Sequence, residues 1–360
     1  MTAIMFGTQM SLYSGKARCY LDWKGVEYTE ILPSPDVFAT EIIPAVGRPV
    51  IPVVKLADNT VLQDTTLIID HFEKTLGGPS PYPVGPRQKL AALLLEAYAD
   101  EWLVIPALHY RWHYNEEWIY GEFGKTALPG GSPAEQYEAG KKRGSTFKGF
   151  VPILGINEAT IPAVEASYEQ LLKDLDAHFA VHPFLFGTRP SIGDYGLIGP
   201  LYAHNYRDPA SGEIMRRLAP RVAQWVERMI APQPLSGEFL ADDEVPETLL
   251  PVLTRMMAEQ VPHLTNVAAM FGEWVQANPG GELPRGLGMA GFAIEGVSGQ
   301  RMAFPFSLWM LQRGLDFFAS LDDEAHSECE GLLHACDGEN LIDFTLPARL
   351  VFEDFKLRVA

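Results

Sequence analysis

Hydrophobic and polar residues follow two different periods in the first 80 residues of the chain. Short apolar or alternating runs at residues 3–7, 26–32, 50–56 and 60–62 predict β-strands, whereas apolar residues spaced three to four apart at 16–24 and 65–74 predict helices. The resulting order, β-α-β and then β-β-α, is typical of a small sheet with helices on its faces. We therefore expect an α/β domain over residues 1–80.

The strand pattern fades after residue 80, and a helical pattern replaces it. The proline-rich stretch 79–86 cannot continue a helix and predicts a linker. Helical spacing in 89–114, 161–179, 191–206 and 215–230 predicts an all-helical bundle domain over residues 87–230, with Pro106 kinking or dividing the first helix. Residues 121–162 are rich in Gly, Pro and Ser, so we expect an insertion or a lid loop there.

Residues 231–360 form a C-terminal extension to which the sequence assigns no role. Helical spacing at 249–276 predicts a helix that Pro262 bends or breaks. Alternation at 291–306 predicts a β-hairpin around Ser298 and Gly299. The acidic runs 242–244 and 322–324 are typical of solvated faces or helix starts.

The amino-acid composition limits which classes of molecule we expect the chain to bind. The chain is 47% apolar and 21% charged, and its 28 Lys and Arg against 46 Asp and Glu give a net charge of −18, which argues against nucleic-acid and membrane partners. The start has no basic leader, and no stretch approaches about 20 uncharged apolar residues. Cys19, Cys329 and Cys336 form no CxxC pair, so we expect a cytoplasmic protein without a metal site.

Four segments carry the candidate chemistry. They are Ser11-Leu12-Tyr13-Ser14-Gly15-Lys16-Ala17-Arg18, Gly47-Arg48-Pro49-Val50-Ile51-Pro52, Leu62-Gln63-Asp64-Thr65-Thr66-Leu67-Ile68 and Phe184-Leu185-Phe186-Gly187-Thr188-Arg189-Pro190-Ser191-Ile192-Gly193-Asp194. In this order they resemble the glutathione S-transferase family patterns S/C-x-x-S-x-[KR]-x-R, G-x-V-P, L-x-E-S-x-A-I and F-L-x-G-x-x-x-S-x-A-D. The resemblance covers about residues 1–230 and implies a thioredoxin-like domain followed by a helical domain.

Two segments also have a direct physical interpretation. A cis Ile51-Pro52 bond, which the resemblance implies, is disfavoured by only about 0.5–1 kcal/mol and would free the Ile51 backbone to pair with an extended peptide. Asp64 and Thr65 lie where a strand ends and a helix begins, which favours a carboxylate site with Asp64 as acceptor from an ammonium group. A simple N-cap is the alternative. In the family this pair is Glu-Ser, so Asp64 is one methylene shorter.

The resemblance implies that glutathione is the co-substrate and that Ser11 is the catalytic residue, donating a hydrogen bond to the thiolate. Lowering a thiol pKa by ~2 units requires about 2.7 kcal/mol. One hydrogen bond to a charged group supplies roughly 1.5–3 kcal/mol and a helix N-terminus about 0.3–1. Tyr13 and Ser14 are alternatives, although Ser14 can instead cap a helix starting at Gly15. We expect Cys19 to be a buried packing residue and not a nucleophile.

The resemblance also places a second-substrate pocket on the helix after the linker, where Tyr13, His109, Trp112 and His113 would meet an apolar electrophile. The alternative is that this helix packs on the insertion. His109 and His113 have metal-ligand spacing, but no second ligand pair accompanies them. Ser191 and Asp194 have the spacing of a capping box, for which we expect a folding role.

We therefore expect a glutathione-dependent transferase that adds the glutathione thiolate to a small hydrophobic electrophile. One alternative is a non-catalytic glutathione-binding or scaffold protein with the same fold. A further alternative is a glutathione-dependent lyase, isomerase or dehalogenase on the same site. The resemblance also suggests a homodimer.

Overall fold

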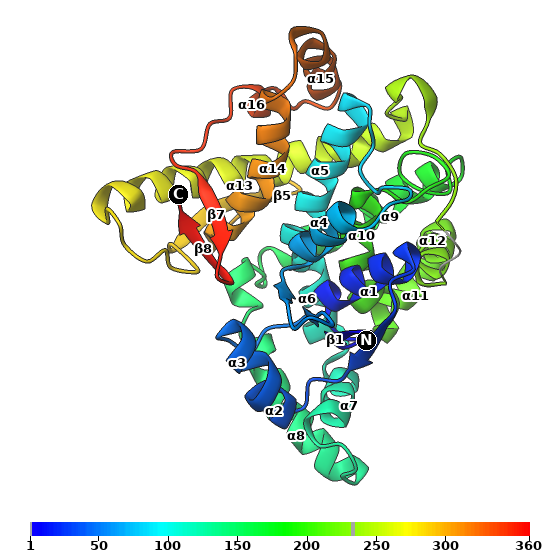
Figure 1. Cartoon of the computed structure of the whole chain (residues 1–360), viewed down its shortest axis with the longest axis vertical. Coiled ribbons are helices and arrows are strands. Elements are labelled where there is room, and N and C mark those ends of the chain that lie inside the picture. The colour runs from blue at the N-terminus through cyan, green and yellow to red at the C-terminus, as the bar shows by residue number, and fades with distance from the viewer. Residues whose placement is uncertain (1, 232–234) are drawn as a thin grey trace. The chain divides into compact units, whose positions relative to one another are not determined.

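The computed structural model describes residues 2–231 and 235–360 (Figure 1). The chain divides into two compact units, each built from separate segments. Unit 1 comprises Met1–Ser80, Pro106–Val151 and Leu197–Ser236. Unit 2 comprises Pro81–Ile105, Pro152–Gly196 and Gly237–Ala360. Within the described residues, no helix has the length and apolarity to cross a membrane.

A four-stranded sheet forms the first part of unit 1. Its strands are β1 (Ala3–Phe6), β2 (Tyr28–Ile31), β3 (Val53–Lys55) and β4 (Val61–Gln63), in the order β2-β1-β3-β4. Strand β1 is parallel to β2, to which the crossover helix α1 connects it, and antiparallel to β3. That helix, α1 (Leu12–Lys24), contacts α4 (Thr65–Thr75), where the Tyr20 hydroxyl donates to Glu73. The predicted thioredoxin-like α/β domain is confirmed.

The connection between β2 and β3 is helical, which the sequence pattern did not indicate. It consists of three short elements, α2 (Pro35–Val37), the π-helix η1 (Phe38–Ile42) and α3 (Ile43–Val46). Ser34 caps the first of them, and Gly47 ends the last in the left-handed conformation with φ 76°. Each piece is too short to show a clear helical period.

The remainder of unit 1 is helical. It contains most of α6 (Val104–Tyr114), α7 (Glu116–Ala127), α8 (Pro133–Lys148), the π-helix η3 (Leu201–Tyr206), α11 (Pro209–Leu218) and α12 (Pro220–Ile230). The loop expected over 121–162 is therefore wrong for most of its length. The glycines there serve close helix packing: a Cβ atom on Gly124 would lie 1.9 Å from the Gln136 carbonyl oxygen, and one on Gly140 would lie 1.9 Å from that of Tyr120.

Unit 2 combines the remaining helices with two β-hairpins. Its main elements are α5 (Pro86–Glu101), α9 (Ile161–Phe179), the start of α10 (Ile192–Pro200), α13 (Leu250–Ala277), α14 (Pro305–Ala319), α15 (Asp323–Ala335), α16 (Glu339–Ile342), β5 (Met289–Ile294), β6 (Val297–Met302), β7 (Leu350–Glu353) and β8 (Lys356–Val359). Three short 3₁₀ turns connect them: η2 (Pro152–Leu154), η4 (Ala241–Asp243) and η5 (Glu247–Leu249). Pro106 divides the predicted first helix into α5 and α6, as expected.

Helix α13 continues through Pro262, which excludes the break that was one of the two expected outcomes, and Val261 and Leu264 on either side of the proline are buried. The expected position of the first hairpin turn is wrong. The first hairpin turns at Glu295 and Gly296, not at Ser298 and Gly299, which lie within β6. Glu295 and Gly296 have φ values of 46° and 75°, as a tight two-residue turn requires.

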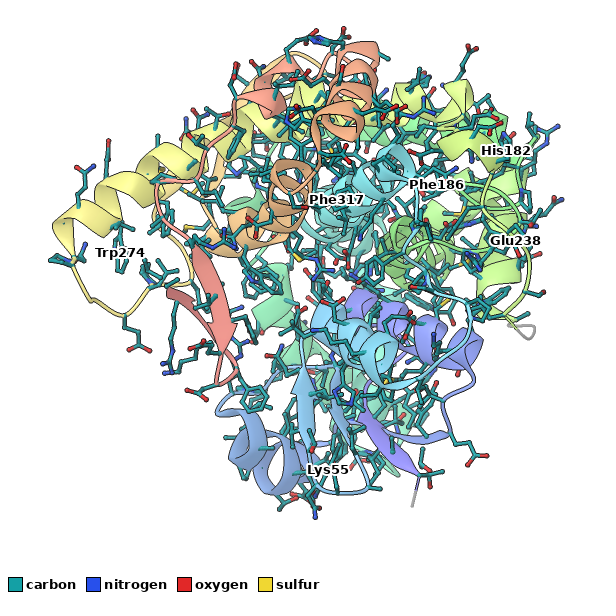
Figure 2. All side chains as sticks on the ribbon, turned by 45° about the horizontal axis from the view of Figure 1, so that its top comes forward. Lys55, His182, Phe186, Glu238, Trp274 and Phe317 are labelled. Carbon is teal, nitrogen blue, oxygen red and sulfur yellow. The ribbon has the colours of Figure 1, made fainter. Side chains whose placement is uncertain are left out.

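Residues 237–360 of the extension are an integral part of unit 2. The Asp243 carboxylate accepts hydrogen bonds from the backbone N–H groups of Arg87 and Gln88 at 2.6 and 2.9 Å, so it caps α5 from a distant point in the sequence. The acidic run that contains Asp243 is thus more than a solvated face. Further along, the Lys89 ammonium lies 4.6 Å from the ring centroid of Phe317 on α14. Figure 2 labels Phe317 among the side chains of the molecule.

Ser191 and Asp194 make the reciprocal bonds of a capping box at the start of α10. The Asp194 carboxylate accepts from the Ser191 backbone N–H and hydroxyl, both at 2.8 Å, and from the Leu185 backbone N–H at 3.2 Å. Both side chains are fully buried. The pair therefore fixes the loop before α10 as well as the helix end.

Candidate functional site

The strand register of the sheet brings three of the sequence segments together. Phe6 pairs with Val53, and Val53 pairs with Gln63. One position further along, Gly7, Pro52 and Asp64 therefore stand side by side, where β1 ends, β3 begins and β4 ends. The bond between Ile51 and Pro52 is cis, as the resemblance implies. We call this sheet edge the Gly7–Pro52–Asp64 row.

The backbone next to the row has unused hydrogen-bonding groups. Over the part of the chain that the structure describes, the N–H and C=O of Ile51 make no hydrogen bond. Ile51 lies two residues before β3 starts and is partly exposed. An extended peptide can therefore pair with it as a short additional strand.

Asp64 is the N-cap of α4. It has the left-handed φ of 75°, and its Oδ1 accepts from the backbone N–H groups of Thr66 at 2.9 Å and Leu67 at 3.4 Å. The capping interpretation of the sequence is thus observed. Thr65 occupies the first helical position, and its N–H and hydroxyl make no hydrogen bond among the described residues, so both can donate to a carboxylate.

Two basic side chains stabilise the surroundings of the row. The buried Lys16 ammonium of α1 donates to the Thr66 hydroxyl at 3.2 Å, which joins α1 to the first turn of α4. Arg48 donates to the Gln63 side-chain oxygen at 3.1 Å and so connects the turn before Pro52 to β4. These contacts hold the two sides of the row in one arrangement.

Ser11 lies at the start of α1. It is the N-cap, and its Oγ accepts from the Ser14 backbone N–H at 3.2 Å. The expectation that Ser14 caps a helix starting at Gly15 is wrong, because α1 already begins at Leu12 and Ser14 is fully buried within it. The Ser11 hydroxyl proton donates to no group in the described residues, so it is available to an incoming anion at the positive end of α1.

Tyr13 and Cys19 also lie on α1, and they differ in exposure. Tyr13 follows in the first turn of α1 and is partly exposed. Cys19 is 4% exposed, and its thiol donates to the Met229 carbonyl at 3.2 Å, as expected for a packing residue. Ser11 and Tyr13 therefore remain the accessible hydroxyl groups of this segment.

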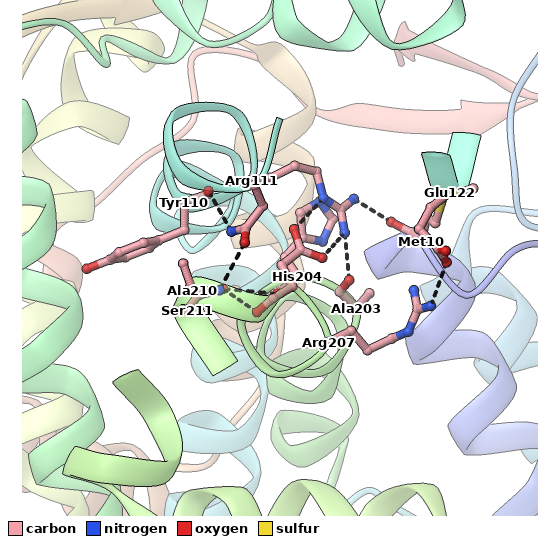
Figure 3. A network of polar contacts seen from close by, with 11 residues as sticks. Met10, Tyr110, Arg111, Glu122, Ala203, His204, Arg207, Ala210 and Ser211 are labelled. Atoms are coloured by element: carbon pink, nitrogen blue, oxygen red, sulfur yellow. Dashed lines mark hydrogen bonds and ion pairs between the residues drawn. The ribbon is translucent and has the colours of Figure 1, made fainter. Parts of the chain in front are cut away.

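A buried arginine of α6 reaches the loop that leads to Ser11. Arg111 donates to the Asp208 carboxylate. It also donates to the carbonyls of Met10 and Ala203, and Figure 3 labels these three residues. Burial raises the pKa of Asp208, and Arg111 opposes that rise. The adjacent His204 is 4% exposed, and burial first, then the charges of Arg111 and Arg207, hold its pKa well below the ordinary value. His204 is therefore neutral.

The residues predicted to line the second-substrate pocket differ in how far they are exposed. Trp112 is 2% exposed and stacks on Phe123 of α7 with ring centroids 6.1 Å apart, which is the packing alternative given above. His109 is fully buried with its Nδ1 3.1 Å from Nδ1 of His113, and His113 is exposed. Among the described residues, no group of three or more His, Cys, Asp or Glu side chains is placed to hold a metal ion.

Sequence reasoning missed Arg111 and Asp208. Arg111 lies in a run of aromatic residues that suggested a ligand pocket, and Asp208 precedes Pro209, where an ordinary helix cap is the obvious interpretation. A lone charged residue on an otherwise apolar helix was the available signal, since such a charge needs a buried partner. The position of that partner, 97 residues away, depends on the fold.

Comparisons with known proteins identify two matching family models. The model "Glutathione S-transferase, N-terminal domain" matches residues 5–80, and "Glutathione S-transferase, C-terminal domain" matches residues 158–228. No curated protein matches the chain.

Solved structures with similarity include three from different sources. A glutathione S-transferase from Rhodospirillum rubrum F11 is 16% identical, with 68% of this chain and 96% of that chain covered and a TM-score of 0.41. The beta-etherase LigF from Sphingobium sp. strain SYK-6 is 16% identical, with 64% and 98% covered and a TM-score of 0.46. The Tau class glutathione S-transferase MiGSTU from mango, Mangifera indica L., is 20% identical, with 69% and 94% covered and a TM-score of 0.42.

Proposed function

The chain belongs to the glutathione S-transferase superfamily, and from this premise we propose that it binds glutathione along the Gly7–Pro52–Asp64 row and transfers the glutathione thiolate to an apolar electrophile. The cysteinyl unit of glutathione pairs with the backbone N–H and C=O of Ile51, which have no partner among the described residues. Pro52 sets the direction of this pairing.

The γ-glutamyl end of glutathione carries both a carboxylate and an ammonium group, and the start of α4 complements both. Its carboxylate accepts from the N–H and hydroxyl of Thr65, at the positive end of the helix. Its ammonium approaches the carboxylate of Asp64, whose Oδ1 already accepts two backbone N–H groups. Asp64 therefore acts both as helix cap and as counter-charge.

Ser11 activates the thiol by stabilising its anion. The hydroxyl donates to the sulfur while its oxygen accepts from the Ser14 N–H, so the direction of the O–H bond is constrained. A hydrogen bond to a charged group contributes roughly 1.5–3 kcal/mol, enough to lower the thiol pKa by about one to two units. No general base is needed.

The electrophile is a small hydrophobic molecule that approaches the partly exposed Tyr13 and the exposed His113, with the fully buried His109 packed against His113. The exposed Tyr114 ring, 5.6 Å from those of both His109 and Tyr110, extends this aromatic group. Aromatic faces favour an apolar second substrate. Trp112 contributes through packing, since it lies in the core beside α7.

The observation that carries the proposal is the unused Ile51 backbone beside the start of α4. Its test is calorimetric titration with glutathione together with turnover of a general aryl halide. We expect micromolar to millimolar binding and measurable conjugation. Binding without turnover would instead support the non-catalytic glutathione-binding protein, and absence of binding would contradict the proposal.

Ser11 variants test the catalytic part. We expect Ser11→Ala to lower turnover at neutral pH at least about tenfold and to raise the pH at which the rate reaches its plateau, because one hydrogen bond to the thiolate is lost. Ser11→Thr keeps the hydroxyl and should retain most of the rate. Ser132→Ala removes a similar cap from α8 and serves as the control for helix capping.

A further inference from the structure

Arg111 uses four donor contacts inside unit 1. Its Nε and Nη2 donate to the two carboxylate oxygens of Asp208 at 2.7 and 2.8 Å. Nη2 also donates to the Ala203 carbonyl at 2.7 Å, and Nη1 donates to the Met10 carbonyl at 2.7 Å (Figure 3). Arg111 is 3% exposed and Asp208 is fully buried. The guanidinium is thus held in a single orientation by its bidentate partner.

Asp208 holds Arg111 in this orientation but does not cap its own helix. Asp208 occupies the N-cap position of α11, but its carboxylate makes no capping bond there. The side-chain oxygen of Asn115 accepts from the Ala210 N–H at 2.9 Å instead, while the Asn115 amide donates to the Tyr110 carbonyl at 2.9 Å. Buried ion pairs are often no more stabilising than apolar replacements, so stability alone does not account for this pair.

The contact to Met10 fixes the peptide group that precedes Ser11. Arg111 binds the carbonyl oxygen of this peptide, and the N–H of the same peptide donates to the Thr8 carbonyl at 3.2 Å. A planar peptide held at both ends cannot rotate. The Gln9 side chain is held as well, since its oxygen accepts from the Tyr202 hydroxyl at 2.7 Å.

We propose that Arg111, oriented by Asp208, is a positioning residue that fixes the Met10–Ser11 peptide and thereby aims the Ser11 hydroxyl at the glutathione sulfur. The inference rests on the proposed function for its catalytic consequence. Its structural part, the immobilisation of residues 8–11, does not depend on catalysis. Because Asp208 neutralises the guanidinium, the effect on the thiolate is geometric rather than a direct charge interaction.

The test is Arg111→Lys, which keeps the charge but lacks the planar fork that reaches Asp208 and Met10 together. We expect the kcat of conjugation to fall at least about tenfold, the pKa of bound glutathione to rise by about one unit, and the Kd for glutathione to change less than about threefold. Amide hydrogen exchange at residues 8–11 should accelerate at least about tenfold. Arg207→Lys, which alters a neighbouring arginine paired with Glu122 at 3.3 Å, is the matched control and should change none of these values.

A double variant separates positioning from folding. Arg111→Met with Asp208→Leu removes both charges, a replacement that buried pairs often tolerate. It should fold, show the same fall in kcat and the same faster exchange. Full kcat with unchanged exchange in either variant, or loss of folding in both, would assign the pair a purely structural role and overturn the inference.

The readouts distinguish the two proposals. Wild-type protein that neither binds glutathione nor turns over would contradict the proposed function, and the catalytic part of this inference with it. Faster exchange in Arg111→Lys would still support the immobilisation of the loop. Normal wild-type turnover with an unchanged kcat in the variants would contradict only the inference.

Discussion

Asp64, at the start of α4, caps the helix and is also proposed to bind the ammonium group of glutathione, and these two roles can be separated. Asp64→Asn keeps a side-chain oxygen for the N–H groups of Thr66 and Leu67 and tolerates the φ of 75°, but it removes the negative charge. If Asp64 faces the ammonium of glutathione, we expect the Kd to rise about tenfold, equivalent to ~1.4 kcal/mol, with the melting temperature almost unchanged. Calorimetry and thermal unfolding measure both values. An unchanged Kd would limit Asp64 to the cap observed here.

A buried capping box should contribute more than an exposed one. Asp194→Ala leaves the backbone N–H groups of Leu185 and Ser191 buried without an acceptor, and each such group costs about 1–3 kcal/mol. We expect a loss of at least about 2 kcal/mol in the free energy of unfolding, measured by urea titration. Glu135→Ala in the exposed box of α8 is the control and should cost less than about 1 kcal/mol. Equal losses would contradict this account.

For single residues, the sequence indicated which positions matter better than it indicated which distant residues they contact. The cap at Asp64 depends on neighbours within a few residues, so it could be predicted, whereas the cap of α1 was expected at Ser14 and lies at Ser11. The Arg111–Asp208 pair and the capping of α5 by Asp243 join residues far apart in the sequence. No local pattern encodes such a contact. Trp112 illustrates the same limit, because an aromatic residue in a helix suits a pocket and a core equally well.

Elements pack through small residues in the α7–α8 hairpin. A Cβ at Gly124 or Gly140 would meet the backbone of the facing helix at 1.9 Å, whereas one at Gly121 meets nothing within 4 Å. We expect Gly140→Ala to separate the two helices and to increase proteolytic cleavage between residues 115 and 150. Gly121→Ala, in the same helix pair, should be neutral or stabilise by about 0.5–1 kcal/mol. Cleavage rates that are equal in the two variants would contradict the packing role.

The same hairpin shows why the loop prediction failed. Glycine and serine at 121–149 lower the helical signal, but the glycines are there because two backbones approach each other. The hairpin turn at Glu295 was missed for a related reason, since a glutamate in the left-handed conformation is uncommon. The long helix α9 was predicted to the residue, because its apolar stripe alone defines it.

Across the whole molecule, acid should destabilise the fold through buried neutral histidines. Burial lowers the pKa of His178 from 6.5 to about 4 and that of His263 to about 3. The unfolded chain binds these protons first, so stability is full above pH 6.5 and falls as the pH decreases towards 4. For His178 alone the loss approaches about 3 kcal/mol.

Urea unfolding at neutral pH and near pH ~5 measures this effect. We expect His178→Gln to lose less stability on acidification than the wild type. His326→Gln, at a half-exposed position, is the control and should behave as the wild type does. A pH dependence that is identical in all three proteins would contradict the assignment to His178.

The fold class was predictable from the sequence, whereas the set of segments that makes up each unit was not. The strand and helix order of residues 1–80 and the helical run that follows it identified the fold class. The units themselves combine segments from across the chain, with residues 81–105 and 237–360 in one of them. That division depends on long-range packing of helices such as α5 against α14, which local periodicity does not contain.

The central claim is that glutathione occupies the sheet edge beside Ile51 and the start of α4. A crystal structure of the protein with bound glutathione tests it most directly. The account predicts that the cysteinyl backbone pairs with the N–H and C=O of Ile51, that the γ-glutamyl carboxylate lies at the N–H of Thr65, and that the sulfur lies within hydrogen-bonding distance of the Ser11 hydroxyl. Density for glutathione elsewhere, with this edge empty, would contradict the account.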